Sequence, residues 1–214
     1  MVTQPSIYWP SGTRILRERF ASCGGSVLEL DALELAPDAV CDELARANVT
    51  ALLLLVGVPE PATAIVRAVR HDPRLRSIQI GAPAGQPEFA SWAASLGKDG
   101  TAIPFLRYLP KNLGTLGDTV EASLRDQLSV RPSFVAFEGY DTIRLIAEIL
   151  RAGKGISSTK ADFWMGAEVE GSRGRISLSR SAGGKIWQWE GAPVQIADRD
   201  PLDIEHYRIL EAVP

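Results

Sequence analysis

The chain has 214 residues, of which 45% are hydrophobic and 23% are charged, a composition typical of folded globular proteins rather than disordered ones. Its 23 basic and 26 acidic residues are spread along the chain without a basic cluster, so we expect no nucleic-acid partner. The most apolar run, residues 51–58, is far shorter than the roughly 20 residues that a membrane-spanning helix needs. The first residues lack the charged and apolar regions of a secretory signal, so we expect no signal peptide in the chain as given.

Five short apolar segments alternate with helical patterns in the first half of the chain. The segments cover residues 6–9, 26–30, 51–56, 77–80 and 101–106. An alternation of this kind favours an open parallel sheet flanked by helices, and therefore the α/β fold class.

The four helical patterns between these segments carry end signals. The first follows Ser11 and Gly12, and the other three begin near Pro37, Pro59 and Pro87, because proline is tolerated in the first turn of a helix. We expect one face of each helix to pack on the sheet. The residues expected on these faces are Ile15, Leu16 and Phe20, then Val40, Cys41 and Leu44, then Ile65, Val66 and Val69, then Phe89, Trp92 and Leu96.

The alternation stops after residue 110. Two helical patterns follow in succession, over residues 116–128 and 133–152, and the second is apolar over more than half of its circumference. Such a helix needs packing partners on several sides. From residue 163 onward, short alternating runs joined by glycines predict an antiparallel β tail, while residues 201–214 show no clear pattern.

The sequence contains no motif for catalysis or metal binding. Cys23 and Cys41 are too few for a disulfide framework, and His71 and His206 are far apart, so we expect no metal site. The nucleophile-elbow, phosphate-loop, zinc-protease and dinucleotide motifs are all missing. We therefore expect no cofactor and no enzymatic activity.

Several motifs in the second half of the chain are more specific than the composition. Pro132 and Ser133 are followed by EGYD at residues 138–141 and by the long apolar helix, and GSRGRISL at residues 171–178 predicts a hairpin. Together with the order of the elements, these motifs resemble the C-terminal part of type I periplasmic binding proteins of the leucine/isoleucine/valine-binding kind. Glu138 and Asp141 could be drawn as an acid–base pair, but we interpret both as structural residues of this motif.

The resemblance implies a type I periplasmic-binding fold with two lobes that close on a ligand. Residues 1–107 would form the second lobe, nearly complete, residues 108–160 a crossing and a helix pair of the partial first lobe, and residues 161–214 the β hairpins that close the lobes. The implied function is that of an extracytoplasmic, periplasmic solute-binding component of an ABC importer. Its partners would be a membrane permease and a small polar organic solute, such as an amino acid, amide or carboxylate. A missing N-terminal lobe or a dimer would complete the structure.

In an open parallel sheet, ligands bind outside the carboxyl ends of the strands. This places three groups of residues on the predicted cleft wall. The predicted ligand-binding residues are Ser11 and Gly12, then Gly57, Val58 and Glu60, and then Ala82 and Pro83.

Several of these residues also have a simpler interpretation. Ser11 could be a helix N-cap and Glu60 a favourable charge at a helix start. Relatives that bind amino acids have an acidic residue after the fourth strand. Here Ala82 and Pro83 stand in that loop, so the ammonium of an amino acid would find no carboxylate unless Glu60 or Glu88 reaches in.

Two other functions fit the same pattern. The chain could be a ligand-sensing or interaction module derived from this fold. It could also be a Rossmann-like or flavodoxin-like regulator that shares only the alternation of strands and helices, because a fold does not determine a function.

Overall fold

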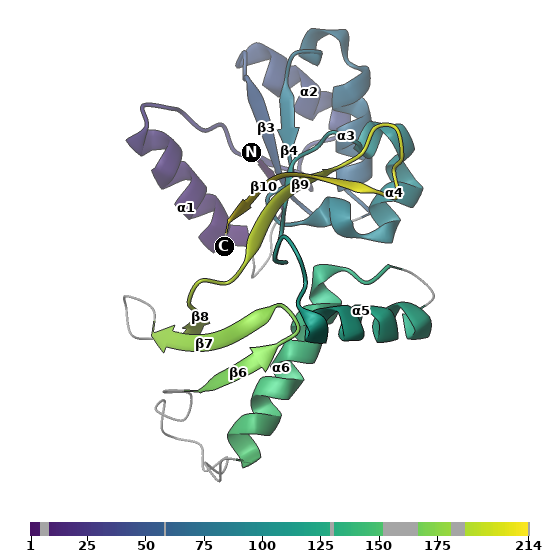
Figure 1. Ribbon diagram of the computed structural model, residues 1–214. Helices are drawn as coiled ribbons and strands as arrows, with labels where there is room; N and C mark the ends of the chain where they lie inside the picture. The colour runs from purple at the N-terminus through teal and green to yellow at the C-terminus, as the bar shows by residue number, and fades with distance from the viewer. Residues whose placement is uncertain (5–8, 58, 129–130, 152–166, 181–186, 214) are drawn as a thin grey trace. The chain divides into compact units, whose positions relative to one another are not determined.

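The computed structural model describes residues 1–4, 9–57, 59–128, 131–151, 167–180 and 187–213 (Figure 1). The chain divides into two compact units. Unit 1 comprises Met1–Leu106 and Ile196–Leu210, and unit 2 comprises Arg107–Gln195 and Glu211–Pro214. The C-terminal strands are therefore shared between the two units, although the sequence pattern placed residues 161–214 together.

Unit 1 is built on a parallel sheet. Strands β1 (Val2–Thr3), β2 (Leu30–Asp31), β3 (Ala51–Leu55) and β4 (Gln79–Gly81) lie in the order β2-β1-β3-β4, and all three pairings are parallel. The parallel α/β class predicted from the alternation of strands and helices is confirmed.

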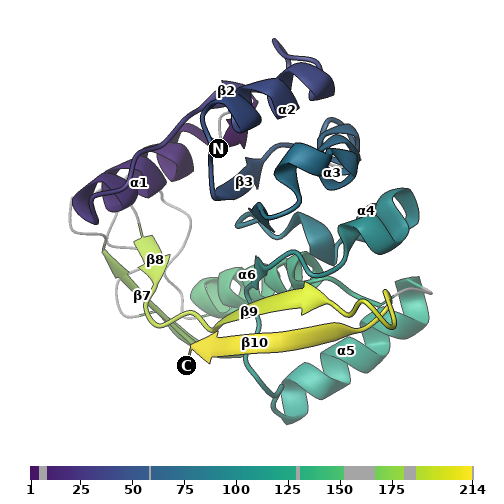
Figure 2. The same ribbon diagram turned by 90° about the horizontal axis from the view of Figure 1, so that it is seen from above.

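A second sheet continues from the end of β4. Ala82 forms a parallel bridge with Phe105 of β5 (Phe105–Arg107). Strand β5 belongs to a three-stranded sheet with β9 (Val194–Arg199) and β10 (Tyr207–Val213), in the order β10-β9-β5. Strands β9 and β10 run in opposite directions (Figure 2), so the C-terminal residues that showed no sequence pattern form a paired strand.

Four α-helices flank the unit 1 sheet. Helix α1 (Trp9–Ser22) lies on one side of β3, and α2 (Pro37–Arg46) and α3 (Ala62–His71) lie on the other (Figure 2). Helix α4 (Ala90–Leu96) follows the short 3-10 helix η2 (Gln86–Glu88). The inward faces predicted for α2 and α3 are confirmed by their buried residues, which are Val40, Cys41 and Leu44, then Ile65, Val66 and Val69. On α4, Trp92 and Leu96 are buried as predicted, whereas Phe89 precedes the helix as its N-cap and is half-buried.

The predictions for the N-terminal end are wrong. The first strand is β1, not residues 6–9, of which Trp9 is helical and residues 6–8 lie outside the described residues. On α1, Ile15 is 58% and Phe20 41% exposed rather than packed on the sheet. A strand of two residues shows no periodicity in a sequence, and the apolar run Ile7, Tyr8 and Trp9 has the composition of a strand instead.

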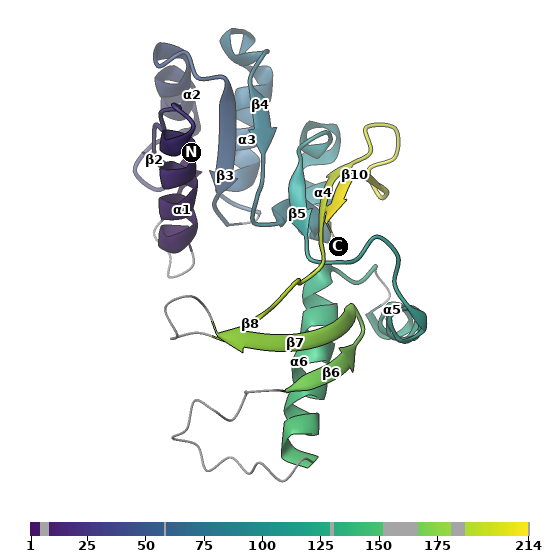
Figure 3. The same cartoon turned by 60° about the vertical axis from the view of Figure 1, so that its left-hand side comes forward.

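Unit 2 combines two helices with an antiparallel sheet. Helices α5 (Thr115–Leu128) and α6 (Phe134–Arg151) carry a small apolar cluster made by Leu109, Val120, Phe134 and Phe137. Strands β6 (Glu168–Gly171), β7 (Gly174–Arg180) and β8 (Trp187–Trp189) form an antiparallel sheet that lies beside α6 (Figure 3). The predicted antiparallel tail is thereby confirmed.

A buried ionic network attaches the β6–β7 turn to α6. Asp141 is 2% exposed and accepts hydrogen bonds from the backbone N–H and hydroxyl of Ser172, at 2.5 and 2.7 Å, and from Arg173 Nε at 2.8 Å. Arg173 also donates to Glu138 and to the carbonyl of Tyr108. Glu138 and Asp141 therefore have structural partners, as the sequence interpretation expected.

The other face of α6 is exposed. Val135, Ile143, Ile146 and Leu150 have exposed fractions of 45, 68, 38 and 43%, and their spacing places them on one side of the helix. We call these four residues the α6 stripe. Among the described residues, no helix is long and apolar enough to cross a membrane.

Candidate functional site

The strand order of unit 1 defines a switch point between β1 and β3. In a sheet of this order, the connections leave the carboxyl ends of the two strands toward opposite faces and leave a crevice between them. The residues that follow β1 and β3 at this C-terminal edge are Gln4 and the pair Val56 and Gly57. They form the centre of the candidate site.

Two glutamine side chains hold one peptide group at this edge. The N–H of Gly57 donates to Gln4 Oε1 at 2.9 Å, and the carbonyl of Val56, in the same peptide group, accepts from Gln86 Nε2 at 3.1 Å. Gln86 Nε2 also donates to the carbonyl of Leu54 at 3.2 Å. The end of β3 is therefore held on both sides by neutral carboxamides, which we call the carboxamide bracket.

The bracket exists because β4 supplies no further N–H group to β3 after Gly81. Successive residues of a parallel strand face alternate neighbours, so Ala82 faces β5 and its amide donates to Pro104 at 2.8 Å. The next residue that would face β3 is Pro83, which has no N–H. The side chain of Gln86, which is 4% exposed, takes over the two carbonyls. Its Oε1 atom is buried and has no hydrogen-bond partner among the described residues.

Arg199 holds the η2 turn that carries Gln86. Arg199 is 2% exposed, and its guanidinium donates to the carbonyls of Pro87, Glu88 and Phe89 at 2.6, 3.3 and 3.2 Å. The hydroxyl of Tyr207 donates to the Glu88 carbonyl at 2.9 Å. The β9–β10 hairpin thus fixes the position of the glutamine from a distant part of the sequence.

The start of α3 offers little to an anion. The amides of Ala62, Thr63 and Ala64 donate to the Gly57 carbonyl, the Pro59 carbonyl and Glu60 Oε2, at 3.3, 2.9 and 3.3 Å. A helix N-terminus binds phosphate or carboxylate through free N–H groups. Because these three donors are occupied within the protein, the edge at α3 is suited to neutral polar groups.

The structure brings only part of the predicted site to the switch point. Gly57 is half-buried within the bracket, and Glu60 is exposed and caps the first turn of α3. Ala82 has no exposed surface, whereas Pro83 is half-exposed. Ser11 and Gly12 are the third and fourth residues of α1, so Ser11 is not the N-cap of that helix. Val58 lies outside the described residues.

Sequence reasoning missed Gln4 and Gln86. Gln4 follows β1 directly, but the first strand was expected further along the chain, at residues 6–9. Gln86 is in the loop after the fourth strand, where only the absence of an acidic residue was considered. A polar side chain directly after β1 was the signal that could have found Gln4, whereas Gln86, five residues after the end of β4, carries no local signal of its own.

The described residues contain no group of three or more His, Cys, Asp and Glu that could hold a metal ion. Burial raises the pKa of the Cys41 thiol, with a further contribution from Asp72, so this thiol stays protonated and is a poor nucleophile. His71 is exposed and lies 3.8 Å from Asp99, away from the bracket.

Comparison with known proteins identifies the fold. No family model and no curated protein matches the sequence. Among solved structures, a solute-binding protein of an ABC transporter from Rhodopseudomonas palustris HaA2, in complex with p-hydroxybenzoic acid, is similar over 100% of this chain and 60% of its own, with 15% identity and a TM-score of 0.71.

Two further structures extend this likeness. The branched-chain amino acid transporter substrate-binding protein of Streptococcus pneumoniae, in complex with isoleucine, has 15% identity, a TM-score of 0.69 and coverage of 98% of this chain and 59% of its own. A branched-chain amino acid ABC transporter ligand-binding protein from Burkholderia xenovorans has 10% identity, a TM-score of 0.70 and coverage of 99% and 57%.

At these identities the likeness shows the fold. The chain has the fold of ABC-transporter solute-binding proteins of the leucine/isoleucine/valine-binding type, as its motifs predicted, and it spans about 60% of the length of the first similar chain.

Proposed function

We propose that the chain is part of an extracytoplasmic solute-binding component of an ABC importer, with unit 1 forming one wall of the binding site. The observation that carries this proposal is the carboxamide bracket at the β1/β3 switch point. It puts neutral hydrogen-bonding groups at the place where open α/β sheets bind ligands. The bracket includes no nucleophile and no acid–base pair, so the proposed role is binding without catalysis.

The chemistry of the wall favours a small polar solute over a zwitterionic amino acid. Gln4 and Gln86 are uncharged, and the carboxylate of Glu60 is used at the start of α3. An ammonium group would gain no ion pair from these three side chains. Similar structures contain p-hydroxybenzoic acid, 3,4-dihydroxybenzoic acid or isoleucine. Of these, the hydroxybenzoic acids carry neutral phenol hydroxyls that can bond to this wall, so we test them together with the uncharged solutes benzamide and urea.

The α6 stripe supports a further lobe. Four large aliphatic side chains on one side of a helix form an apolar surface that a soluble protein normally covers. We propose that a lobe outside residues 1–214 packs on the α6 stripe and supplies the second wall of the site. The α6 stripe is then an internal surface of a larger protein. The permease binds this larger protein when its two lobes are closed on the solute.

A thermal-shift screen tests the proposal. The longest form of the protein that the reading frame encodes is heated with 4-hydroxybenzoate, 3,4-dihydroxybenzoate, isoleucine, benzamide and urea. A solute at 100 times its Kd stabilises by about 2.7 kcal/mol, which raises Tm by roughly 5–10 °C in a chain of this size. The Gln4→Leu variant should show a smaller shift at the same solute concentration, whereas Gln79→Leu, at an exposed position of β4, should retain the full shift.

The outcomes separate the alternatives. If no solute raises Tm, the binding role is wrong. Bound flavin or nucleotide, visible by absorbance in the purified protein, would favour the flavodoxin-like regulator instead.

A further inference from the structure

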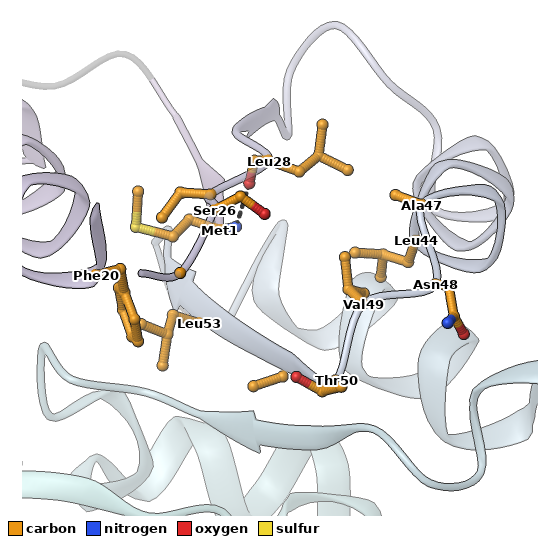
Figure 4. A pocket seen from close by; sticks show the side chains of 13 residues that line it. Met1, Phe20, Ser26, Leu28, Leu44, Ala47, Asn48, Val49, Thr50 and Leu53 are labelled. Atoms are coloured by element: carbon orange, nitrogen blue, oxygen red, sulfur yellow. Dashed lines mark hydrogen bonds between the residues drawn. The ribbon is translucent and has the colours of Figure 1, made fainter. Parts of the chain in front are cut away.

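A pocket lies at the opposite, N-terminal edge of the unit 1 sheet (Figure 4). Its volume is about 320 Å³. Two stretches of backbone, residues 25–28 and 47–51, form its sides, and Met1, Phe20, Leu44 and Leu53 complete the lining. The pocket is therefore enclosed by the residues that precede β2 and by the beginning of β3.

At this edge of the sheet, β1 does not extend as far as its neighbour β3. Strand β1 pairs with β3 only through Val2 and Thr3, opposite Leu54 and Leu55. Strand β3 begins three residues earlier, at Ala51, where it pairs with β4. Ala51 is exposed although it belongs to an interior strand. The pocket lies beside the first residues of β3, where β1 does not extend.

The backbone of β3 directs hydrogen-bonding groups into the pocket. In a parallel sheet, successive residues turn their N–H and C=O groups to alternate neighbours. The carbonyl of Thr50 accepts from Gln79 at 3.2 Å, so the groups of Ala51 and the N–H of Leu53 point to the other side. That side is the one on which the pocket lies.

The amino group of Met1 already occupies a position in the strand ladder. Leu30 N donates to the Met1 carbonyl at 2.9 Å, Ala32 N donates to the Thr3 carbonyl at 2.7 Å, and Met1 N donates to the Leu28 carbonyl at 2.5 Å. These bonds repeat every two residues, as in a continuous parallel pairing. Burial lowers the pKa of this amino group below its ordinary value of 8.0. The charged ammonium of Met1 thus occupies a buried position in the strand pairing, to which a neutral peptide N–H is better suited.

The register of β1 extends directly into the pocket. Val2 lies between Leu30 and Leu54, so Met1 lies opposite Glu29 and Leu53. The four preceding positions would lie between the pairs Leu28 and Leu52, Val27 and Ala51, Ser26 and Thr50, and Gly25 and Val49. All of these residues except Leu52 line the pocket.

Each face of the pocket carries large apolar side chains, and three polar residues complete the lining. Phe20 and Leu53 lie together on one side, and Leu44 and Val49 on the other (Figure 4). Parallel strands that are covered on both faces are hydrophobic at every position rather than at alternate positions. An occupant that runs along the pocket would therefore be extended and apolar throughout.

We propose that this pocket accepts an extended, apolar segment of about four residues that continues β1 on the N-terminal side of Met1, as in a longer form of this chain. The segment would pair with the backbone of Ala51 and Leu53 and turn the Met1 ammonium into a peptide N–H. This chain covers 60% of the first similar solute-binding chain, so that protein contains further segments beyond the matched part.

The test adds residues to the chain of 214 residues. One variant carries Val-Ile-Val-Ala directly before Met1, and a control of the same length carries Ser-Gly-Pro-Gly, which forms strands poorly. The apolar extension should raise Tm by at least about 4 °C relative to the control. It should also slow amide exchange at Ala51 and Leu53 at least about tenfold, with little change at Leu52, which faces β4.

Three results would overturn the proposal. The two extensions could give the same Tm, the amides of Ala51 and Leu53 could already exchange as slowly as that of Leu52, or light scattering could show that a second copy protects them. Solute binding at the carboxamide bracket is measured separately, so neither result decides the other.

Discussion

The two ends of β3 in the unit 1 sheet differ in the groups that meet their backbone N–H and C=O groups. At its C-terminal end, the backbone groups of β3 are taken by the side chains of Gln4 and Gln86. At its N-terminal end, the groups of Ala51 and Leu53 face an apolar pocket. A strand end held by polar side chains is complete and can face a polar solute, whereas an end beside an apolar pocket fits another segment of strand. We therefore assign solute binding to the C-terminal end of β3 and strand pairing to its N-terminal end.

The largest effect should come from Arg199, which positions the C-terminal edge. Arg199→Met leaves the carbonyls of Pro87, Glu88 and Phe89 without this donor. We expect a loss of about 3–5 kcal/mol in the free energy of unfolding, measured with urea. Arg19→Met, on the exposed surface of α1, is the control and should cost less than about 0.5 kcal/mol. Equal losses in the two variants would contradict the positioning role.

The second effect concerns Gln86 itself. Gln86→Leu removes two hydrogen bonds and leaves the carbonyls of Leu54 and Val56 buried without this donor. The expected cost is about 2–4 kcal/mol by urea unfolding, because an unsatisfied buried acceptor loses its full solvation. The exposed control Gln79→Leu should be nearly neutral. A Gln86 variant as stable as this control would show that the bracket does not hold β3.

A smaller effect is expected for Gln4, which is only half-buried. Gln4→Leu removes the acceptor of the Gly57 N–H and should cost about 1 kcal/mol. The same variant should weaken solute binding at least about fivefold in a calorimetric titration. Normal affinity in this variant would place the solute elsewhere.

The smallest effect is a pH dependence at the other edge. The pKa of the Met1 amino group is lowered by burial in the folded chain, so unfolding takes up a proton between the lowered pKa and 8.0. Stability should therefore be fully present above pH 8 and decline as the pH falls through this window. The apolar extension before Met1 should remove this dependence, which is measured by urea unfolding between pH 6 and about 9. An unchanged slope in the extended variant would contradict the buried position of the amino group.

Much of the fold could be predicted from the sequence because local signals agree with the tertiary structure. Proline at the start of α2 and the apolar spacing of α2 and α3 predicted the helices and their buried faces. The run of leucines predicted β3. Glu138 and Asp141 of the EGYD motif were interpreted as structural residues, and Asp141 bonds to Ser172 and Arg173.

The remainder depends on contacts between distant residues. Strand β1 is two residues long and is defined by its neighbours β2 and β3 rather than by a pattern of its own. Gln86 gains its role only because the next residue of the chain that would face β3 is Pro83, which has no N–H, and because Arg199, far along the sequence, holds the turn that carries Gln86. The exposed Ile15 and Phe20 on α1 show the same limit, because helical periodicity does not reveal what covers a face.

Chemical-shift mapping of the isotope-labelled protein with a bound solute tests the central claim most directly. The account predicts that 4-hydroxybenzoate, or another solute that raises Tm, shifts the backbone amides of Gly57 and Glu60 and the side-chain amides of Gln4 and Gln86, at the C-terminal edge. The amides of residues 26–28 and 50–51, beside the N-terminal pocket, should not move. Shifts confined to that pocket, with none at the carboxamide bracket, would contradict the account.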